Sequence, residues 1–498
     1  FSSGRCNKLH YNNKLHLAGG KGTNALCHSS NGIYWKSNNS VNSQRLLPNG
    51  TWRKPFDLSN NTFVGGIAFT NVNENNYNVS NRIVAGFPKG STGGYLVIYN
   101  FSINGDTWID NNNILYPENE DIPEQYIFTD SNFGMNVLIS NDGKHIASGA
   151  PDFQNLIGTN TYKKGKVVVY TNTSNSNNWN DSTAIIKKYI QLPTSEYASS
   201  LSTLNLFTSS DDDLFGHSIA FFHNYTKMLI GSPGTDSNRG FVFIYDLNST
   251  PPAFDTYYLS LSITTKKQFG YGIEINLDGT RCIITDGTEN AYYFIFSSVD
   301  SKWGLEDTSN DQNRLPNQIL PYESSLFTDA SFGFSSTMND DGDWCAIGAP
   351  NANGKGAVVI YSYNIQYDKW VINQYIFGNE LTLVSGDQFG YSVKMNGSGN
   401  SLMISTNNIN GIGEKSYAYT YNYSTTKRIW EIYRNPHNTM HDDITHNGIF
   451  RFHNYNFTDS PIDLKTIAFN KDFSRFVIGG NTIIDGSDKA ILSIFHNE

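Results

Sequence analysis

The chain has 498 residues, of which 16% are charged and 14% are aromatic, and its formal net charge is −10. Charged residues are too sparse and aromatic residues too frequent for a disordered chain, and the acidic balance argues against a basic surface for nucleic acid or anionic membranes. No apolar run reaches the ~18 residues needed to span a bilayer. Asn and Gly favour turns, and Tyr, Phe, Val and Ile favour strands, so the composition predicts many short strands joined by turns.

Residues 1–58 form an N-terminal unit that differs from the rest of the chain. Four strand-like runs lie within residues 5–37, two of them at Leu15–Gly20 and Ala25–His28. Cys6 and Cys27 are candidates for a disulfide because both lie in this unit. Their spacing alone does not settle whether they pair.

One pattern recurs from residue 59 to residue 498. It opens with Phe-Gly and a short alternating strand, turns on Asn, Asp and Gly, and continues in an apolar strand that ends in Gly-Ala-Pro or a related sequence. Two further strands follow, the last often marked by Trp. In chain order the copies begin at Phe63, Phe133, Phe215, Phe269, Phe332, Phe389 and Leu464.

The pattern predicts a four-stranded antiparallel sheet for each copy. Asp-Gly between two alternating runs is a strong hairpin signal, because both residues tolerate a positive φ. Pro has no N–H group for the ladder, so Gly-Ala-Pro ends a strand. A sheet that is apolar on both faces must be covered on both, and stacking such sheets around an axis gives a β-propeller.

We therefore predict an all-β chain folded as a single propeller of eight four-stranded blades, with residues 1–58 as the eighth. The alternative is seven blades, in which the N-terminal region closes the ring by completing the last unit, since that unit reaches Glu498 with only three strands. Long insertions leave the ring, and loops of this kind are expected to carry function. They lie near residues 109–132, 191–214, 298–331 and 434–463.

These motifs resemble FG-GAP repeats, most closely the short variety in which an acidic residue precedes Phe-Gly, as Asp213 and Asp387 do here. The resemblance covers about residues 60–498 and extends distantly to the integrin α-chain. The N-terminal unit is similar to a degenerate Asp-box repeat, with Asn31 in place of Asp. The resemblance implies a propeller with an extracellular or surface binding role and no particular reaction. Asn-rich propellers of this kind also resemble those of large DNA viruses, which implies a virion-associated protein.

The metal-binding potential of the chain rests on two segments. Integrin-type repeats hold Ca²⁺ in an Asp-x-Asp-x-Asp-Gly loop that this chain shortens. Only Asn339, Asp341 and Asp343 offer oxygens at alternate positions, and we expect a hairpin turn with solvated carboxylates there and no cofactor. The last insertion holds a histidine cluster whose spacing matches no strong zinc motif, so we expect a polar loop. Its members are His437, His441, His446 and His453.

Three further features carry expectations about exposure. Cys282 and Cys345 occupy matching positions of neighbouring copies, which predicts two buried thiols rather than a disulfide. The acidic run Asp211–Asp213 is expected to cap a turn and stay solvated. Asn-x-Ser/Thr sequons are glycosylation candidates if the protein is extracellular, and otherwise mark solvated turns. They begin at Asn38, Asn49, Asn60, Asn78, Asn100, Asn172, Asn180, Asn224, Asn248, Asn396, Asn422 and Asn456.

The sequence predicts a non-enzymatic structural or recognition propeller on a virion or cell surface, within a larger assembly. It would bind protein or glycan partners through its loops, since aromatic-rich surfaces suit both. No catalytic residues are predicted, because no nucleophile–base order or phosphate loop is present. The alternative is a secreted carbohydrate-active hydrolase on the same scaffold, which requires a carboxylate pair near the axis.

Overall fold

The structure is a computed structural model. It describes residues 5–12, 15–21, 26–29, 36–37, 46–47, 50–51, 64–69, 82–88, 93–102, 107–109, 113–117, 128, 130–157, 160–174, 178–179, 181–193, 212–261, 267–306, 313–320, 322–323, 327, 330–381, 383, 385–407, 417–432, 445–446, 449–451, 462–469, 475–484 and 487–496.

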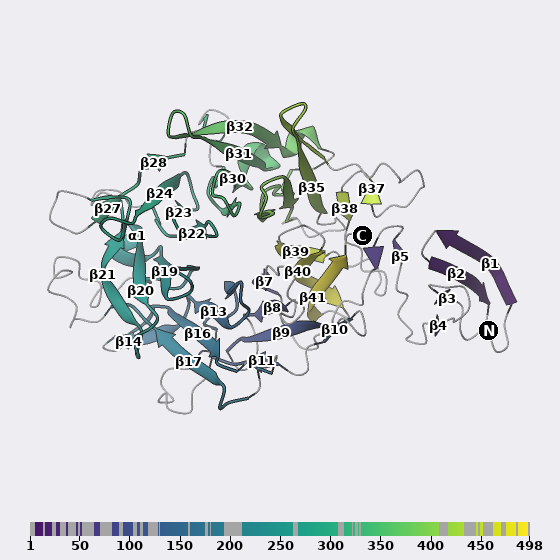
Figure 1. The fold of residues 1–498 in the computed structure, drawn as a ribbon, viewed down its shortest axis with the longest axis horizontal. Coiled ribbons are helices and arrows are strands. Elements are labelled where there is room, and N and C mark those ends of the chain that lie inside the picture. The colour runs from purple at the N-terminus through teal and green to yellow at the C-terminus, as the bar shows by residue number, and fades with distance from the viewer. Residues whose placement is uncertain are drawn as a thin grey trace.

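Six sheets, each built on four antiparallel strands, form the blades of a β-propeller (Figure 1). The first three blades each run from an inner strand at the axis to an outer strand. Blade one is β7 (Ile67–Phe69), β8 (Arg82–Phe87), β9 (Tyr95–Ser102) and β10 (Thr107–Ile109), with β11 (Ile114–Leu115) also on β9. Blade two is β12 (Val137–Ile139), β13 (His145–Ala150), β16 (Lys166–Asn172) and β17 (Ile185–Ile190), and carries a hairpin of β14 (Gln154–Ile157) and β15 (Asn160–Lys163). Blade three is β18 (Ser218–Phe222), β19 (Lys227–Ser232), β20 (Phe241–Asp246) and β21 (Ala253–Leu259).

The next three blades repeat this plan and recruit strands from the insertions. Blade four is β22 (Gly272–Ile275), β23 (Arg281–Thr285), β24 (Ala291–Ser297) and β25 (Lys302–Trp303), with β28 (Gln318–Ile319) also on β24. Blade five is β29 (Ser335–Met338), β30 (Trp344–Ala349), β31 (Ala357–Asn364) and β32 (Lys369–Phe377). Blade six is β33 (Val393–Met395), β34 (Ser401–Ser405), β35 (Tyr417–Ser424) and β36 (Ile429–Ile432), with β38 (Ile449–Arg451) and β37 (Thr445–His446). The edge of blade three gains β27 (Asn313–Leu315) and β26 (Leu305–Glu306), and the short helical turn α1 (Thr235–Asn238) precedes β20.

A three-stranded sheet occupies the space between blade six and blade one. It consists of β39 (Ile462–Phe469), β40 (Arg475–Ile484) and β41 (Ser487–His496). Its inner strand β39 contacts both β33 of blade six and β7 of blade one. The ring therefore closes through the C-terminal sheet (Figure 1).

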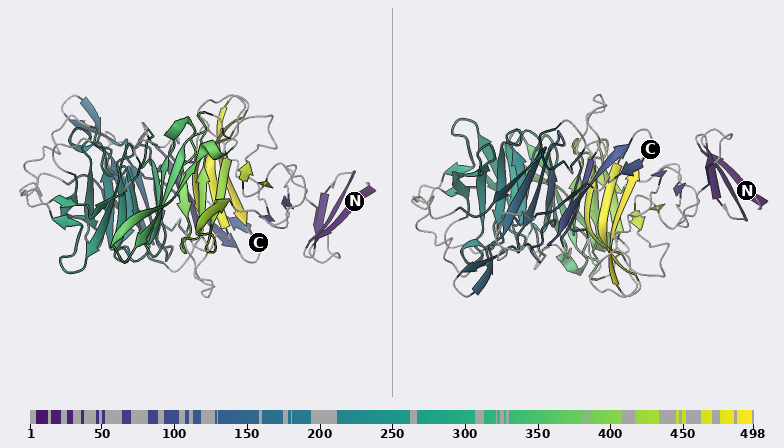
Figure 2. Two further views of the ribbon diagram at one scale, coloured as in Figure 1. Left: turned by 90° about the horizontal axis from the view of Figure 1, so that it is seen from above. Right: turned by 90° about the horizontal axis from the view of Figure 1, so that it is seen from below.

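The N-terminal sheet lies outside this ring (Figures 1 and 2). It pairs β1 (Arg5–Asn12), β2 (Leu15–Lys21), β3 (Leu26–Ser29) and β4 (Lys36–Ser37) in sequence order, and β5 (Leu46–Leu47) pairs with β6 (Gly50–Thr51). The predicted count of eight blades is not confirmed, because the C-terminal sheet meets blade one directly. β6 lies against β41, so closure involving the N-terminal region stays a prediction.

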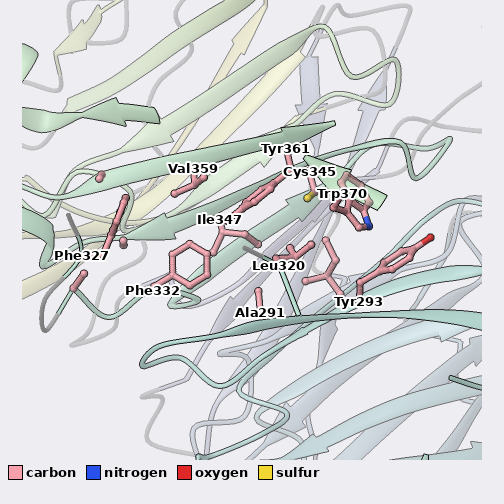
Figure 3. Packing of buried hydrophobic residues seen from close by; sticks show 14 of the residues in the cluster. Ala291, Tyr293, Leu320, Phe327, Phe332, Cys345, Ile347, Val359, Tyr361 and Trp370 are labelled. Carbon is pink, nitrogen blue, oxygen red and sulfur yellow. The ribbon is translucent and has the colours of Figure 1, made fainter. Parts of the chain in front are cut away.

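The hydrophobic core lies between neighbouring blades, as the apolar character of both sheet faces predicts. One cluster joins Tyr293 of blade four to Ile347, Val359 and Tyr361 of blade five, all buried (Figure 3). Trp370 on the outer strand β32 closes this cluster, with its ring 5.4 Å from that of Tyr293. Each blade thus shields the apolar side chains of the next one.

The Phe-Gly and Gly-Ala-Pro motifs meet between blades, which explains why both recur. A Cβ on Gly149, the glycine of one Gly-Ala-Pro, would overlap the carbonyl oxygen of Gly216, the Phe-Gly glycine of the next blade. Gly348 stands in the same relation to Gly390. Gly216 has a φ of 89°, which L side chains rarely adopt. Both motifs therefore need glycine so that neighbouring backbones can touch.

The burial of the Asp213 carboxylate shows that the predicted solvation of the acidic run Asp211–Asp213 is wrong at this residue. Asp213 is buried and pairs with Lys164, whose side chain is only 6% exposed. Asp212 is exposed and accepts a hydrogen bond from the backbone N–H of Lys163, and Asp211 lies outside the described residues. The ion pair thus links the segment that precedes Phe215 in blade three to the hairpin of blade two.

Candidate binding site at the mouth of the axial channel

The inner strands of all six blades and of the C-terminal sheet surround an axial cavity of about 880 Å³. Its wall includes Ile67 of β7, Ser218 of β18, Ser336 of β29 and Thr466 of β39. A cavity of this size falls within the range of about 300–1,000 Å³ that is usual for small-ligand sites.

Four aromatic side chains form a continuous arc around one end of this cavity. Each follows the Phe-Gly pair of its blade, and we call the set the aromatic arc: His217, Tyr271, Phe334 and Tyr391. Successive ring centroids lie 4.4, 5.8 and 5.0 Å apart, and successive rings tilt by 42°, 43° and 44°. The near-constant tilt indicates that the rings follow the rotation from blade to blade.

The arc has a cationic end and an interruption. The ammonium of Lys465, from the C-terminal sheet, lies 5.6 Å from the ring centroid of Tyr391, within range of a cation–π contact. In blade two the equivalent residue is Met135, which is 39% exposed, and Gly65 lines the cavity in blade one. The ring wall therefore extends over blades three to six, and Met135 and Gly65 interrupt it over blades two and one.

An ion pair spans the cavity three residues beyond the arc along the inner strands. Glu274 of β22 accepts a hydrogen bond of 2.9 Å from the ammonium of Lys394 on β33. These strands belong to blades four and six, so the pair passes in front of blade five. Their side chains are 26% and 37% exposed respectively, and the pair presents both an acceptor and a donor to the cavity.

Burial sets the protonation of the arc at neutral pH. Burial, together with the nearby Tyr391 phenol, raises the pKa of Tyr271 to about 12. Burial lowers the pKa of His217, although the Tyr271 carbonyl and Asp152 oppose that shift. Nδ1 of His217 lies 2.9 Å from this carbonyl, which only accepts, so Nδ1 carries the proton and Nε2 is an acceptor. The rings of the arc are thus uncharged and have polar tips, and the Lys465 ammonium adds a positive charge beside Tyr391.

We expect the melting temperature to fall as the pH is lowered through about 6.5. Burial lowers the pKa of His217 and His145 in the folded chain, whereas the unfolded chain binds protons at the ordinary pKa. Unfolding therefore takes up protons below that pH, and stability is lost as the pH falls toward the lowered pKa values. A His217→Phe chain, melted by circular dichroism at about pH 7.5 and pH 5, should lose less stability than wild type. Equal losses in both chains would contradict this role of His217.

The segment of blade five that holds the weak metal candidates Asn339, Asp341 and Asp343 is a hairpin turn. The Asn339 side chain is buried, and its carbonyl oxygen accepts hydrogen bonds from the N–H groups of Asp343 and Trp344. Its amide donates to the Asp343 carboxylate at 2.7 Å. Asp341 is exposed in the turn. Across the described residues, no group of three or more His, Cys, Asp or Glu side chains is placed to hold a metal ion.

The histidine cluster of the last insertion lies largely beyond the part of the chain that the structure describes. His437, His441 and His453 are outside it, and His446 belongs to the short strand β37. The expected polar loop therefore stays a prediction for these residues.

The cysteines separate into two groups. Cys282 and Cys345 are free and buried, as predicted, and burial raises the pKa of both thiols well above its ordinary value. Cys6 lies opposite Gly20 of β2, and Cys27 lies opposite Ala18 of the same strand. β2 therefore runs between the strands that carry Cys6 and Cys27, and the pairing of these two residues stays a prediction.

The sequons differ in exposure. Asn100, Asn172 and Asn396 are buried, and each hydrogen-bonds within its sheet or turn, so a glycan there would require local unfolding. Asn224 and Asn248 are exposed, and Asn422 is half-buried. The remaining candidates lie outside the described residues: Asn38, Asn49, Asn60, Asn78, Asn180 and Asn456.

The comparisons with known proteins leave the structure as the main guide to function. No protein family matches the sequence, and no curated protein matches it either. In the part of the chain that the structure describes, no helix is long and apolar enough to cross a membrane.

The aromatic arc was not predicted, although the sequence holds a signal for it. The residue after Phe-Gly is aromatic or histidine in four consecutive copies, at the point where the chain enters the inner strand. The Glu274–Lys394 pair had no such signal, because its partners stand on different blades.

Proposed function

We propose that the protein is a non-enzymatic recognition propeller of a virion or cell surface, and that the mouth of its axial channel binds a protein or glycan partner. The observation that carries the proposal is the aromatic arc, a continuous wall of rings at the rim of the cavity. Aromatic side chains supply large contact area at a low entropy cost, and they concentrate where proteins bind partners.

Three of the four described carboxylates that line the cavity favour recognition over hydrolysis, and the fourth belongs to Asp340. A glycoside hydrolase uses two carboxyl groups that face the bond between them, about 5–9.5 Å apart. Here Glu274 pairs with Lys394, and Asp152 pairs with Lys163. Asp278 accepts a hydrogen bond from the backbone N–H of Thr280. Salt-bridged and turn-forming carboxylates are poor candidates for a general acid and its partner base.

The proposal includes membership of the FG-GAP-like propellers and a place in a larger surface assembly. The contacts between Phe-Gly and Gly-Ala-Pro glycines support that membership, since they give each motif residue a structural role. We also propose that the C-terminal sheet serves as a seventh blade, completed at its outer edge by the N-terminal region. The contact of β6 with β41 supports this closure.

Binding of the fluorescently labelled full chain to intact cells or native particles tests the proposal. Phe334→Arg places a bulky charge in the arc, and Ile365→Arg places the same charge on an outer turn, where the side chain is 82% exposed. We expect Phe334→Arg to weaken binding at least tenfold, about 1.4 kcal/mol, and Ile365→Arg to leave it unchanged. Equal binding by both variants, with both folded by circular dichroism, or glycan hydrolysis by the wild-type chain, would refute the proposal.

A further inference from the structure

We infer that the axial site binds a neutral sugar residue of a glycan, with the sugar ring against the aromatic arc and its hydroxyls on the Glu274–Lys394 pair. This inference rests on the proposed recognition function and names the chemistry of the ligand. Three features of the site support it. The aromatic arc forms a wall of uncharged rings, the Glu274–Lys394 pair forms a floor of opposite charges, and the arc is interrupted over blades one and two.

The wall suits the apolar face of a pyranose. A sugar ring exposes C–H groups on its faces and hydroxyls around its edge, so it needs an apolar surface bordered by polar atoms. Tyr271 and Tyr391 flank Phe334, and each adds a phenol hydroxyl to the apolar rings. The raised pKa of Tyr271 keeps its phenol a hydrogen-bond donor at neutral pH. His217 adds an acceptor at Nε2.

The floor suits vicinal hydroxyls better than a charged group. A hydroxyl both donates and accepts, so neighbouring hydroxyls can donate to the Glu274 carboxylate and accept from the Lys394 ammonium. These two groups already lie 2.9 Å apart. The Lys394 ammonium would repel a cationic ligand that approached Glu274. The Glu274 carboxylate would likewise repel an anionic ligand that approached Lys394. The paired charges therefore favour a neutral, hydroxyl-rich ligand.

The interruption of the arc allows a glycan chain to leave the site. The ring wall is interrupted over blades two and one, where the flexible Met135 side chain and Gly65 stand in place of an aromatic ring. The cavity of about 880 Å³ holds more than one sugar ring. A terminal sugar can thus reach the floor while the rest of the glycan extends over blades one and two.

Titration of the full chain with neutral methyl glycosides tests the inference. The probes are methyl hexosides and a methyl N-acetylhexosaminide, with sialyllactose as the anionic comparison and an arginine-containing peptide as the cationic one. Binding is followed by saturation-transfer NMR and calorimetry. We expect at least one neutral glycoside to bind more tightly than either charged probe.

One variant of the arc, one variant of the floor and one matched control decide where the sugar binds. Tyr391→Leu and Glu274→Gln should weaken the binding of that glycoside at least tenfold. Tyr367→Leu, which removes a tyrosine 66% exposed on an outer turn, should leave it unchanged. If Tyr391→Leu lowers the melting temperature strongly, Phe334→Leu replaces it. Binding that all variants retain would overturn the inference.

The sugar inference and the recognition function fail in different ways. If no neutral glycoside binds, or if a charged probe binds best, the sugar inference is wrong. If Phe334→Arg nevertheless abolishes binding of the chain to cells or particles, the proposed recognition function stands and the partner is a protein. If neither particle binding nor glycoside binding depends on the arc, both are wrong.

Discussion

A Gly149→Ala chain is expected to lose about 3 kcal/mol of its free energy of unfolding. The added methyl group would overlap the carbonyl oxygen of Gly216 on the neighbouring blade. Both partners are backbone at a blade interface, so neither can move aside by changing a rotamer. Relief requires the two blades to separate, and separation exposes the apolar cluster that includes Val167 and Phe215. The loss is measured as the shift in denaturant midpoint by tryptophan fluorescence.

Gly354→Ala is the matched control, because this glycine is exposed and a Cβ there would lie 3.3 Å from the nearest atom, Oγ of Ser385. Its positive φ makes a cost of about 1 kcal/mol the expected result. The tight contact between Phe-Gly and Gly-Ala-Pro would be disproved if Gly149→Ala were no more destabilising than Gly354→Ala.

Asp213→Ala is expected to destabilise the chain by about 3–5 kcal/mol, since it leaves the Lys164 ammonium without its carboxylate in a buried site. Asp213 has no exposed side-chain surface, and that of Lys164 is 6% exposed. The pair connects the hairpin of blade two to the entry of blade three. Thermal unfolding followed by calorimetry gives the loss directly.

The double variant Lys164→Met with Asp213→Leu separates charge from packing. Replacing a buried ion pair by apolar residues of similar volume is often neutral or stabilising, so this chain should melt within a few degrees of wild type. If Asp213→Ala alone proved nearly neutral, or if the double variant were as unstable as the single one, the ion pair would not be the source of the stability.

The repeats made the blades predictable because their signals are local. Asp-Gly turns such as Asp278-Gly279 set hairpins, and Gly-Ala-Pro marks the end of the second strand. The burial of Cys282 and Cys345 followed from their matching positions. These features depend on neighbours within one sheet, and the sequence displays such neighbours side by side.

Features that depend on contacts between distant residues were harder to predict. The N-terminal unit has strand-like runs of its own, and nothing in Leu15–Gly20 tells whether its sheet joins a ring. The run Asp211–Asp213 was predicted to be solvated because the partner of the buried Asp213, Lys164, stands on another blade and is distant in sequence. The sequons at Asn100 and Asn396 look like surface turns, yet both side chains fold inward. The Glu274–Lys394 pair likewise forms only because the ring brings two blades to one axis.

Closure of the ring by the C-terminal sheet is the central structural claim, and a designed cross-link tests it most directly. The N–H of Val64 donates to the carbonyl of Gly480, and a Cβ on Gly479 would lie 2.8 Å from the Cβ of Val64. Small shifts therefore allow a disulfide between Val64→Cys and Gly479→Cys. Under mild oxidation of the folded monomer, we predict an intramolecular disulfide between these positions, identified by peptide mass spectrometry and missing from either single variant. A folded double variant that stays reduced, or cross-links only between molecules, would contradict the closed ring and the axial site within it.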